Sequence, residues 1–190
     1  CNSISDVLVD GISVGAVSSY TFTNIQANHT IQAIFVTTPY TITVNQAANG
    51  NISPGTGTVE CGSNATYNIT PDPCYSIQNV FVDGVPAGPV TAYTFTNVTA
   101  IHTITAVFEL TTYSITATPG ADGSITPAGT PVYNCGSTIS YNITPDVCFH
   151  IVDVLVDGVS VGAVSSYTFS NINANHTISI SPDGKYFIDN

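Results

Sequence analysis

Apolar and polar residues alternate along most of this chain. Residues 40–45 read YTITVN and residues 66–70 read TYNIT. A period of two is typical of a β-strand with one buried face, and no long segment shows the period of a helix. Asp-Gly pairs at 10–11, 83–84 and 157–158 separate apolar runs, which is a strong signal for a two-residue hairpin turn. The pattern therefore predicts an all-β fold.

The strand pattern recurs along the chain as a tandem repeat. The segment that begins at Cys1 returns at Cys74 and again at Cys148. A second shared block begins at Tyr40 and returns at Tyr113. We therefore predict the C-terminal half of a repeat at 1–39, a complete repeat at 40–112, a nearly complete repeat at 113–180 and a divergent tail or cap at 181–190.

The repeat is small, and the connections between its copies are short. A unit of about 73 residues buries only a modest share of its surface by itself. We expect about six strands in each unit, arranged as a small sandwich or a β-grasp-like sheet. Only residues 109–112 and 36–39 separate the end of one repeat from the start of the next. Connections of this length predict tandem β-domains that form a semi-rigid rod.

The cysteines recur at fixed positions of the repeat. Cys61 and Cys74 lie close together in sequence, and Cys135 and Cys148 have the same spacing, so we predict the disulfides Cys61–Cys74 and Cys135–Cys148, one within each repeat. A bridge that closes such a loop contributes about 3 kcal/mol in the chain-entropy model. Disulfides indicate an oxidising, extracytoplasmic compartment. Buried free thiols are the alternative, whereas zinc is disfavoured because no CxxC pair occurs.

Cys1 is the fifth cysteine, which these two predicted pairs leave over. It aligns with Cys74 and Cys148, so the same rule places its partner upstream of residue 1. We therefore expect Cys1 to be unpaired within this chain or bonded to another molecule. Two interpretations stay open: the chain is a window of a longer protein, or it is a subunit whose half repeat is completed by a neighbouring copy through strand addition.

The charge balance excludes several classes of partner. One basic residue stands against twelve acidic ones, for a formal net charge of −11. Binding to nucleic acid or to an anionic membrane surface needs Lys and Arg, so neither partner is expected. No apolar run approaches the ~20 residues of a membrane helix. The acidic residues are scattered and no GxSxG elbow occurs, so we expect no enzyme activity, no metal site and no cofactor.

Three sets of residues recur with the repeat and are candidates for chemistry. The histidines His29, His102 and His176 precede apolar strands, and we expect a structural role for them. Tyrosine and phenylalanine at fixed positions alternate within strands, which favours core packing over a sugar-stacking surface. Seven asparagines lie in Asn-Xaa-Ser/Thr sequons and are candidates for N-glycosylation: Asn28, Asn51, Asn64, Asn68, Asn97, Asn142 and Asn175. The alternative is that these sequons occur by chance in a sequence rich in Asn and Thr.

The strings YTIT, YNITPD, VDGVSVGAVSSYTF and NHTI together resemble the divergent internalin-type (InlB-like) B-repeat of bacterial surface proteins. The resemblance covers residues 1 to about 180. It implies an all-β module strung in tandem on large secreted or surface-anchored proteins, without catalytic residues to transfer. We therefore expect an extracellular structural protein: a stalk, an adhesin or a filament subunit that contacts neighbouring copies of itself or adjacent repeats. The alternatives are a module that binds glycans or a host or surface protein, and an accessory repeat of a large secreted enzyme.

Overall fold

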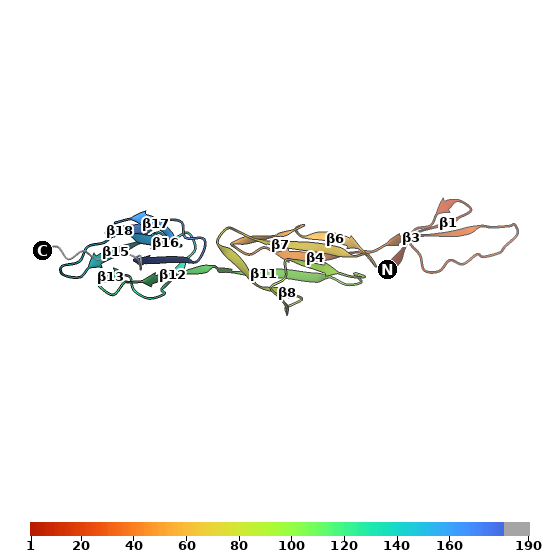
Figure 1. Cartoon of the computed structure of the whole chain (residues 1–190). Helices are drawn as coiled ribbons and strands as arrows, with labels where there is room; N and C mark the ends of the chain where they lie inside the picture. The colour runs from red at the N-terminus through yellow and green to blue at the C-terminus, as the bar shows by residue number, and fades with distance from the viewer. Residues whose placement is uncertain (181–190) are drawn as a thin grey trace. The chain divides into compact units, whose positions relative to one another are not determined.

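The computed structural model describes residues 1–180, which form 19 β-strands and no helix (Figure 1). The predicted all-β fold is therefore confirmed. Residues 40–112 and residues 113–180 each contain eight strands rather than about six, because short strands such as β6 (Gly57–Glu60) and β9 (Val85–Gly88) add to the longer ones. The predicted tail or cap at 181–190 lies outside the described residues.

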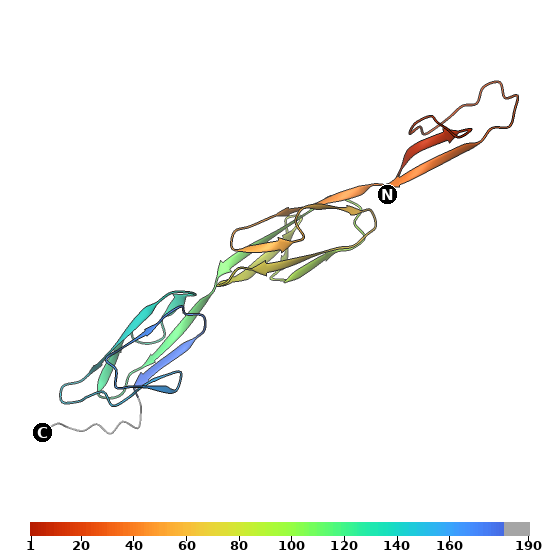
Figure 2. The same cartoon turned by 90° about the horizontal axis from the view of Figure 1, so that it is seen from above.

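The repeat at 40–112 consists of two β-sheets (Figure 2). A five-stranded sheet has the order β6-β4-β11-β8-β9, and a three-stranded sheet has the order β10-β7-β5. β4 and β11 pair in parallel, whereas β5 and β10 flank β7 in antiparallel pairs. The remaining bounds are β4 (Pro39–Asn45), β5 (Gly50–Ser53), β7 (Ala65–Pro71), β8 (Tyr75–Val82), β10 (Ala92–Phe95) and β11 (His102–Leu110).

The core of this repeat contains residues from both sheets. Within β7, Tyr67 and Ile69 are buried while Thr66 and Asn68 are exposed, as the alternation predicted. Ile42 from β4 and other apolar residues of the two sheets join the same cluster. Two sheets with a shared apolar interior make this repeat a small β-sandwich.

The repeat at 113–180 has the same construction. Its sheets have the orders β14-β12-β19-β16-β17 and β13-β15-β18, again with one parallel pair, between β12 and β19. Tyr141 and Ile143 take the core positions that correspond to Tyr67 and Ile69. The strands are β12 (Thr112–Thr118), β13 (Gly123–Thr126), β14 (Val132–Asn134), β15 (Ile139–Pro145), β16 (Val154–Val156), β17 (Val159–Gly162), β18 (Ser166–Phe169) and β19 (His176–Ile180).

The segment 1–39 contains one three-stranded sheet, β2-β1-β3. Its strands β1 (Asn2–Val9), β2 (Ile12–Ser13) and β3 (Ile31–Thr37) correspond in sequence to β8, β9 and β11. Every residue of β3 is exposed, with Phe35 at 62 % and Ile31 at 56 %. The reason is that a second sheet, β10-β7-β5, packs on the five-stranded sheet in the repeat 40–112, whereas residues 1–39 contain only the sheet β2-β1-β3. In addition, β4 pairs with β11, and no corresponding strand of residues 1–180 pairs with β3.

The predicted Asp-Gly hairpins are present in all three copies. Asp83 and Gly84, at the turn between β8 and β9, have φ angles of 51° and 79°. Asp10-Gly11 and Asp157-Gly158 have almost the same values. Positive φ at both central residues is the signature of a type I′ turn, which matches the twist of the flanking strands.

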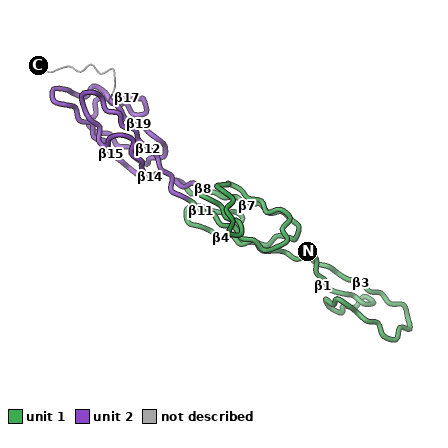
Figure 3. The backbone as a smooth tube through the Cα atoms, turned by 90° about the horizontal axis from the view of Figure 1, so that it is seen from below, with its two compact units in different colours: residues 1–72, 77–108 green, residues 73–76, 109–190 purple. Residues whose placement is uncertain are grey.

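The chain divides into two compact units (Figure 3). One contains Cys1–Asp72 and Ile77–Phe108, and the other contains Pro73–Ser76 and the described residues from Glu109 to Ile180. The short segment Pro73–Ser76 lies within the repeat 40–112 in sequence, yet it belongs to the unit that follows. Cys74 lies in this segment and therefore belongs to the same unit as the repeat 113–180.

Candidate functional site

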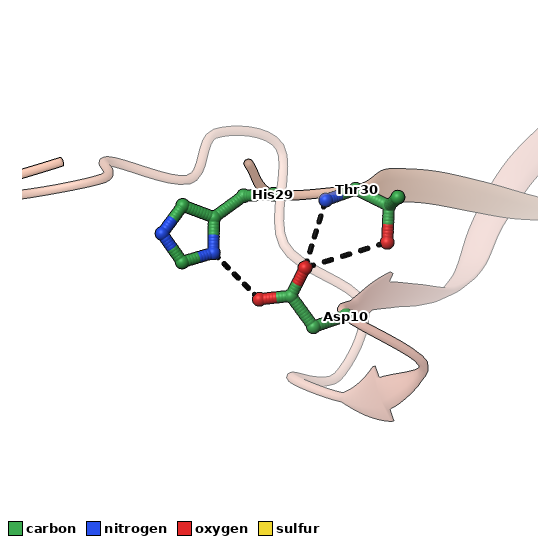
Figure 4. Close-up of polar contacts among 3 residues, drawn as sticks. All are labelled: Asp10, His29 and Thr30. Atoms are coloured by element: carbon green, nitrogen blue, oxygen red, sulfur yellow. Dashed lines mark hydrogen bonds and ion pairs between the residues drawn. The ribbon is translucent and has the colours of Figure 1, made fainter. Parts of the chain in front are cut away.

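An aspartate, a histidine and a threonine form a polar cluster in the segment 1–39 (Figure 4). Asp10 belongs to the hairpin turn after β1, and His29 and Thr30 immediately precede β3. The Nδ1 atom of His29 lies 2.7 Å from Oδ2 of Asp10. The backbone N–H of Thr30 donates to Oδ1 of Asp10 at 2.8 Å. Both carboxylate oxygens are therefore occupied, and they hold the hairpin turn against the start of β3.

The same cluster occurs in both complete repeats. Asp83 pairs with His102, and Asp157 pairs with His176, each at 2.7 Å and with the following threonine N–H as a second donor. Each histidine ring also packs on a phenylalanine, with ring centroids 4.9 Å apart for Phe95 and His102. The expected structural role of these histidines agrees with this geometry. Sequence reasoning missed the aspartate partner, although the constant separation of 19 residues in all three copies was an available signal.

Hydrogen bonding lowers the pKa of the three aspartates. The hydrogen bond from His29, and then the one from the Thr30 backbone, lowers the pKa of Asp10. At Asp83, partial burial acts to raise the pKa, but the hydrogen bonds from His102 and Thr103 outweigh it and the net shift is downward. The pKa of Asp157 is lowered by the same balance. Each cluster is therefore built around an ionised carboxylate.

This arrangement predicts an acid-dependent contribution to stability. A carboxylate whose pKa is lower in the folded state stabilises the fold above its ordinary pKa, near 3.8, and loses that contribution as the pH falls through the folded-state value. We expect Asp83→Asn to flatten the decline of the melting temperature below about pH 4, measured by circular dichroism from pH 2 to pH 6. Asp72→Asn, at an exposed aspartate of the same repeat, is the control. Equal pH slopes for the two variants would contradict the role of the cluster.

Each cluster contains one carboxylate and one imidazole. No group of three or more His, Cys, Asp or Glu side chains within residues 1–180 could hold a metal ion. Both oxygens of Asp10 already accept hydrogen bonds from groups of the chain itself. The geometry supports a structural role, in which the aspartate links the Asp-Gly hairpin turn to the start of the neighbouring strand once in every copy of the repeat.

The disulfides differ from the predicted ones. The structure pairs Cys1 with Cys61 and Cys74 with Cys135, with Cα atoms 5.4 Å and 5.3 Å apart, and Cys148 is free and exposed. The predicted pairs Cys61–Cys74 and Cys135–Cys148 are therefore wrong, and so is the expectation that Cys1 has no partner within this chain. Each bridge joins the second half of one repeat to the first half of the next.

The physical reason lies in the strand between the two predicted partners. β7 separates Cys61 from Cys74, and its seven residues, at a rise of about 3.4 Å each, place the strand ends roughly 20 Å apart. A disulfide requires Cα atoms within about 7 Å. The chain between repeats instead brings the observed partners together, since Thr111 donates its N–H to the carbonyl of Cys74 and accepts a hydrogen bond from the N–H of Cys135.

This pairing can be checked by thiol labelling. Alkylation of the unfolded but unreduced chain is expected to modify one cysteine, and peptide mapping should place the label on Cys148. Labelling after reduction, which modifies all five cysteines, is the control for access. A label on Cys1 would instead support pairing within each repeat.

The seven sequon asparagines are all exposed to solvent. Two of them also make hydrogen bonds through the side-chain oxygen: Asn64 accepts from the N–H of Asn97, and Asn175 accepts from the N–H of Ser114. Exposure is a requirement for glycan attachment, and glycosylation at these asparagines remains a prediction.

The recurring aromatic residues lie mainly in the core. Phe95 and Phe169 are buried, and Tyr93 and Tyr167 are partly buried against the same clusters. Tyr20, at the corresponding position in the segment 1–39, is 43 % exposed. The prediction of core packing therefore holds in the complete repeats, where a second sheet covers these side chains.

Comparison with known families gives a match over both complete repeats. The divergent InlB B-repeat domain matches residues 40–112 and residues 113–181. Comparisons with curated proteins and with solved structures gave no match. No helix within residues 1–180 is long and apolar enough to cross a membrane. The family indicates an extracellular repeat module of secreted or surface proteins of bacteria, structural rather than catalytic. With both complete repeats matched, the chain belongs to the divergent InlB B-repeat family.

Proposed function

We propose that this chain is a structural spacer in a secreted or surface-anchored protein, where it holds other parts at a distance as a stalk or the shaft of an adhesin. The observation that carries the proposal is the covalent coupling of successive repeats. Cys1–Cys61 and Cys74–Cys135 both join one repeat to the next rather than closing a loop within a repeat. A disulfide at this position restricts bending between neighbours, which a spacer needs and an isolated binding domain does not.

The short connection supports the same function. β11 ends at Leu110 and β12 begins at Thr112. Thr111, the residue between them, is hydrogen-bonded to both Cys74 and Cys135.

The sequence also contains only 7 % charged residues, so Thr, Ser and Asn, with any attached sugar, would supply solubility.

Electron microscopy of the full oxidised chain tests the spacer function. Particles of one length with a narrow distribution of bend angles are expected, because the bridges and the short connections limit movement between repeats. Reduction should broaden the bend-angle distribution. A broad distribution in the oxidised protein, equal to that of the reduced protein, would contradict a spacer.

A filament subunit is the second candidate, and the open face of the segment 1–39 favours it. An apolar depression there is lined by Ile4, Val7, Val17, Ser18, Ser19, Tyr20, Ile31 and Ala33. In the complete repeats, the sheets β10-β7-β5 and β13-β15-β18 pack on the corresponding face, and β4 or β12 pairs with the strand that corresponds to β3. In a filament, a second copy would add a strand along the edge of β3 that no strand of residues 1–180 pairs with.

Sedimentation velocity and electron microscopy of the full chain at increasing concentration test this candidate. Open head-to-tail fibres are expected for a filament subunit. Dispersed monomers throughout the concentration range would rule it out. Retention of glycans by such monomers on a glycan array would instead favour the alternative of a carbohydrate-binding module.

A further inference from the structure

The two disulfides define a covalent route through the chain that is much shorter than the backbone. The bridge from Cys1 leads directly to Cys61, and the bridge from Cys74 leads directly to Cys135, over sequence separations of 60 and 61 residues. Between the bridges the route follows only residues 61–74, and after the second bridge it follows residues 135–148. Each backbone section spans 13 steps.

We propose that this route bears mechanical tension and protects the folded repeats from being unfolded by a pulling force. When the chain is stretched between Cys1 and Cys148, the bridges carry the force past residues 2–60 and 75–134. These bypassed residues cannot be extended while the bridges are intact. The proposal adds a tension-bearing role to the spacer proposed above, but the route itself follows from the disulfide connectivity alone.

The strand within each section is suited to this load. Residues 61–74 contain β7, the central strand of the sheet β10-β7-β5. Antiparallel partners flank it on both sides, and its Tyr67 and Ile69 are each 2 % exposed. Tension between Cys61 and Cys74 acts along the strand, so the hydrogen bonds to both neighbours resist it together. β15 occupies the same central place between β13 and β18 in the section 135–148.

The route ends at an accessible thiol. Cys148 corresponds in sequence to Cys1 and Cys74, and it has the same left-handed backbone conformation as Cys74, with φ angles of 72° and 69°. Unlike these two residues it forms no disulfide, and its side chain is exposed. Its thiol is therefore a natural point at which to hold the chain and load the proposed route from end to end.

The proposal has a numerical consequence for extensibility. Two sections of 13 steps, at about 3.5 Å per residue, and two bridges limit the distance from Cys1 to Cys148 to roughly 100 Å. After reduction the same ends are joined by 147 backbone steps, which reach about 510 Å. Disulfides within each repeat, Cys61–Cys74 and Cys135–Cys148, would leave 121 steps and an extension of about 430 Å.

Single-molecule force spectroscopy on the full chain tests the route. One handle is attached through an N-terminal peptide tag and the other through a maleimide on the Cys148 thiol. The oxidised protein is expected to extend by no more than about 100 Å between residues 1 and 148, and addition of a reductant should raise this limit about fivefold. An oxidised protein that extends as far as the reduced chain, or as far as a chain bridged within each repeat, would overturn the proposal.

A paired substitution serves as the internal control. In Cys1→Ser/Cys61→Ser the route must follow the backbone from residue 1 to Cys74, so the limit is expected to rise by about 200 Å. These contour lengths hold whether or not the variant folds as stably as the wild type. An unchanged limit in this variant would overturn the route through Cys61. Failure of the spacer proposal in the microscopy would leave the extension limits unchanged, so the two proposals fail separately.

Discussion

Simultaneous replacement of Cys74 and Cys135 by serine is expected to lower the free energy of unfolding by about 4 kcal/mol in the chain-entropy model. The reason is the length of the loop, because the bridge joins residues that are 61 apart in sequence. Without it the unfolded chain gains the conformational freedom of that whole loop. Urea denaturation of the wild type and the double variant, both under non-reducing conditions, measures the difference.

Cys148→Ser is the matched control for this experiment. Cys148 is exposed and forms no disulfide, so its replacement should change stability by less than about 0.5 kcal/mol. A loss from Cys148→Ser equal to that of the double variant would show that Cys148, and not Cys74, is the partner of Cys135. The expected loss in the free energy of unfolding is larger than the contribution of about 3 kcal/mol from a bridge within one repeat, because the loop closed by Cys74–Cys135 is longer.

The second large effect is expected for Tyr141→Ala, which should destabilise the repeat 113–180 by about 3–5 kcal/mol. The Tyr141 side chain is fully buried, its ring packs edge-on against Phe169 at a centroid distance of 5.8 Å, and its hydroxyl lies 3.2 Å from that of Tyr133. Alanine would leave a cavity between the two sheets. Hydrogen exchange read by mass spectrometry would localise the loss of protection to this repeat.

Two further variants separate the causes. Tyr141→Phe keeps the ring and removes only the hydroxyl, so we expect a loss of about 1 kcal/mol. Val132→Ala, in β14 of the same repeat at a side chain that is 63 % exposed, should change stability by less than about 0.5 kcal/mol. Comparable losses from Tyr141→Ala and Val132→Ala would contradict the placement of the core.

The bridges between repeats and the cores within repeats have different tasks. Each complete repeat has its own apolar cluster, centred on residues such as Tyr67 in one and Tyr141 in the other. The disulfides add covalent links across the short connections. A reductant is therefore expected to affect extensibility and bending more directly than the packing inside a repeat.

The sequence by itself determined the strands, the turns and the composition of the core. Side chains on a strand point alternately to opposite faces, so the period of two was enough to place Tyr67 and Ile69 inside and Thr66 outside. Asp83-Gly84 predicted its hairpin because the preference of this pair for positive φ is local. The family was also recognisable from short strings of residues, and the match over 40–112 and 113–181 confirms it.

Tertiary structure alone decided which distant side chains meet. Separation in sequence suggested that Cys61 pairs with Cys74, although the alternating residues between them already predicted an extended strand that holds them apart. The contact of Asp83 with His102 likewise depends on how β8 and β11 lie side by side in one sheet. Local patterns specify backbone conformation and which face is buried, whereas the pairing of strands sets the neighbours. The disulfide connectivity, and with it the covalent route through the repeats, therefore became visible only in the folded chain.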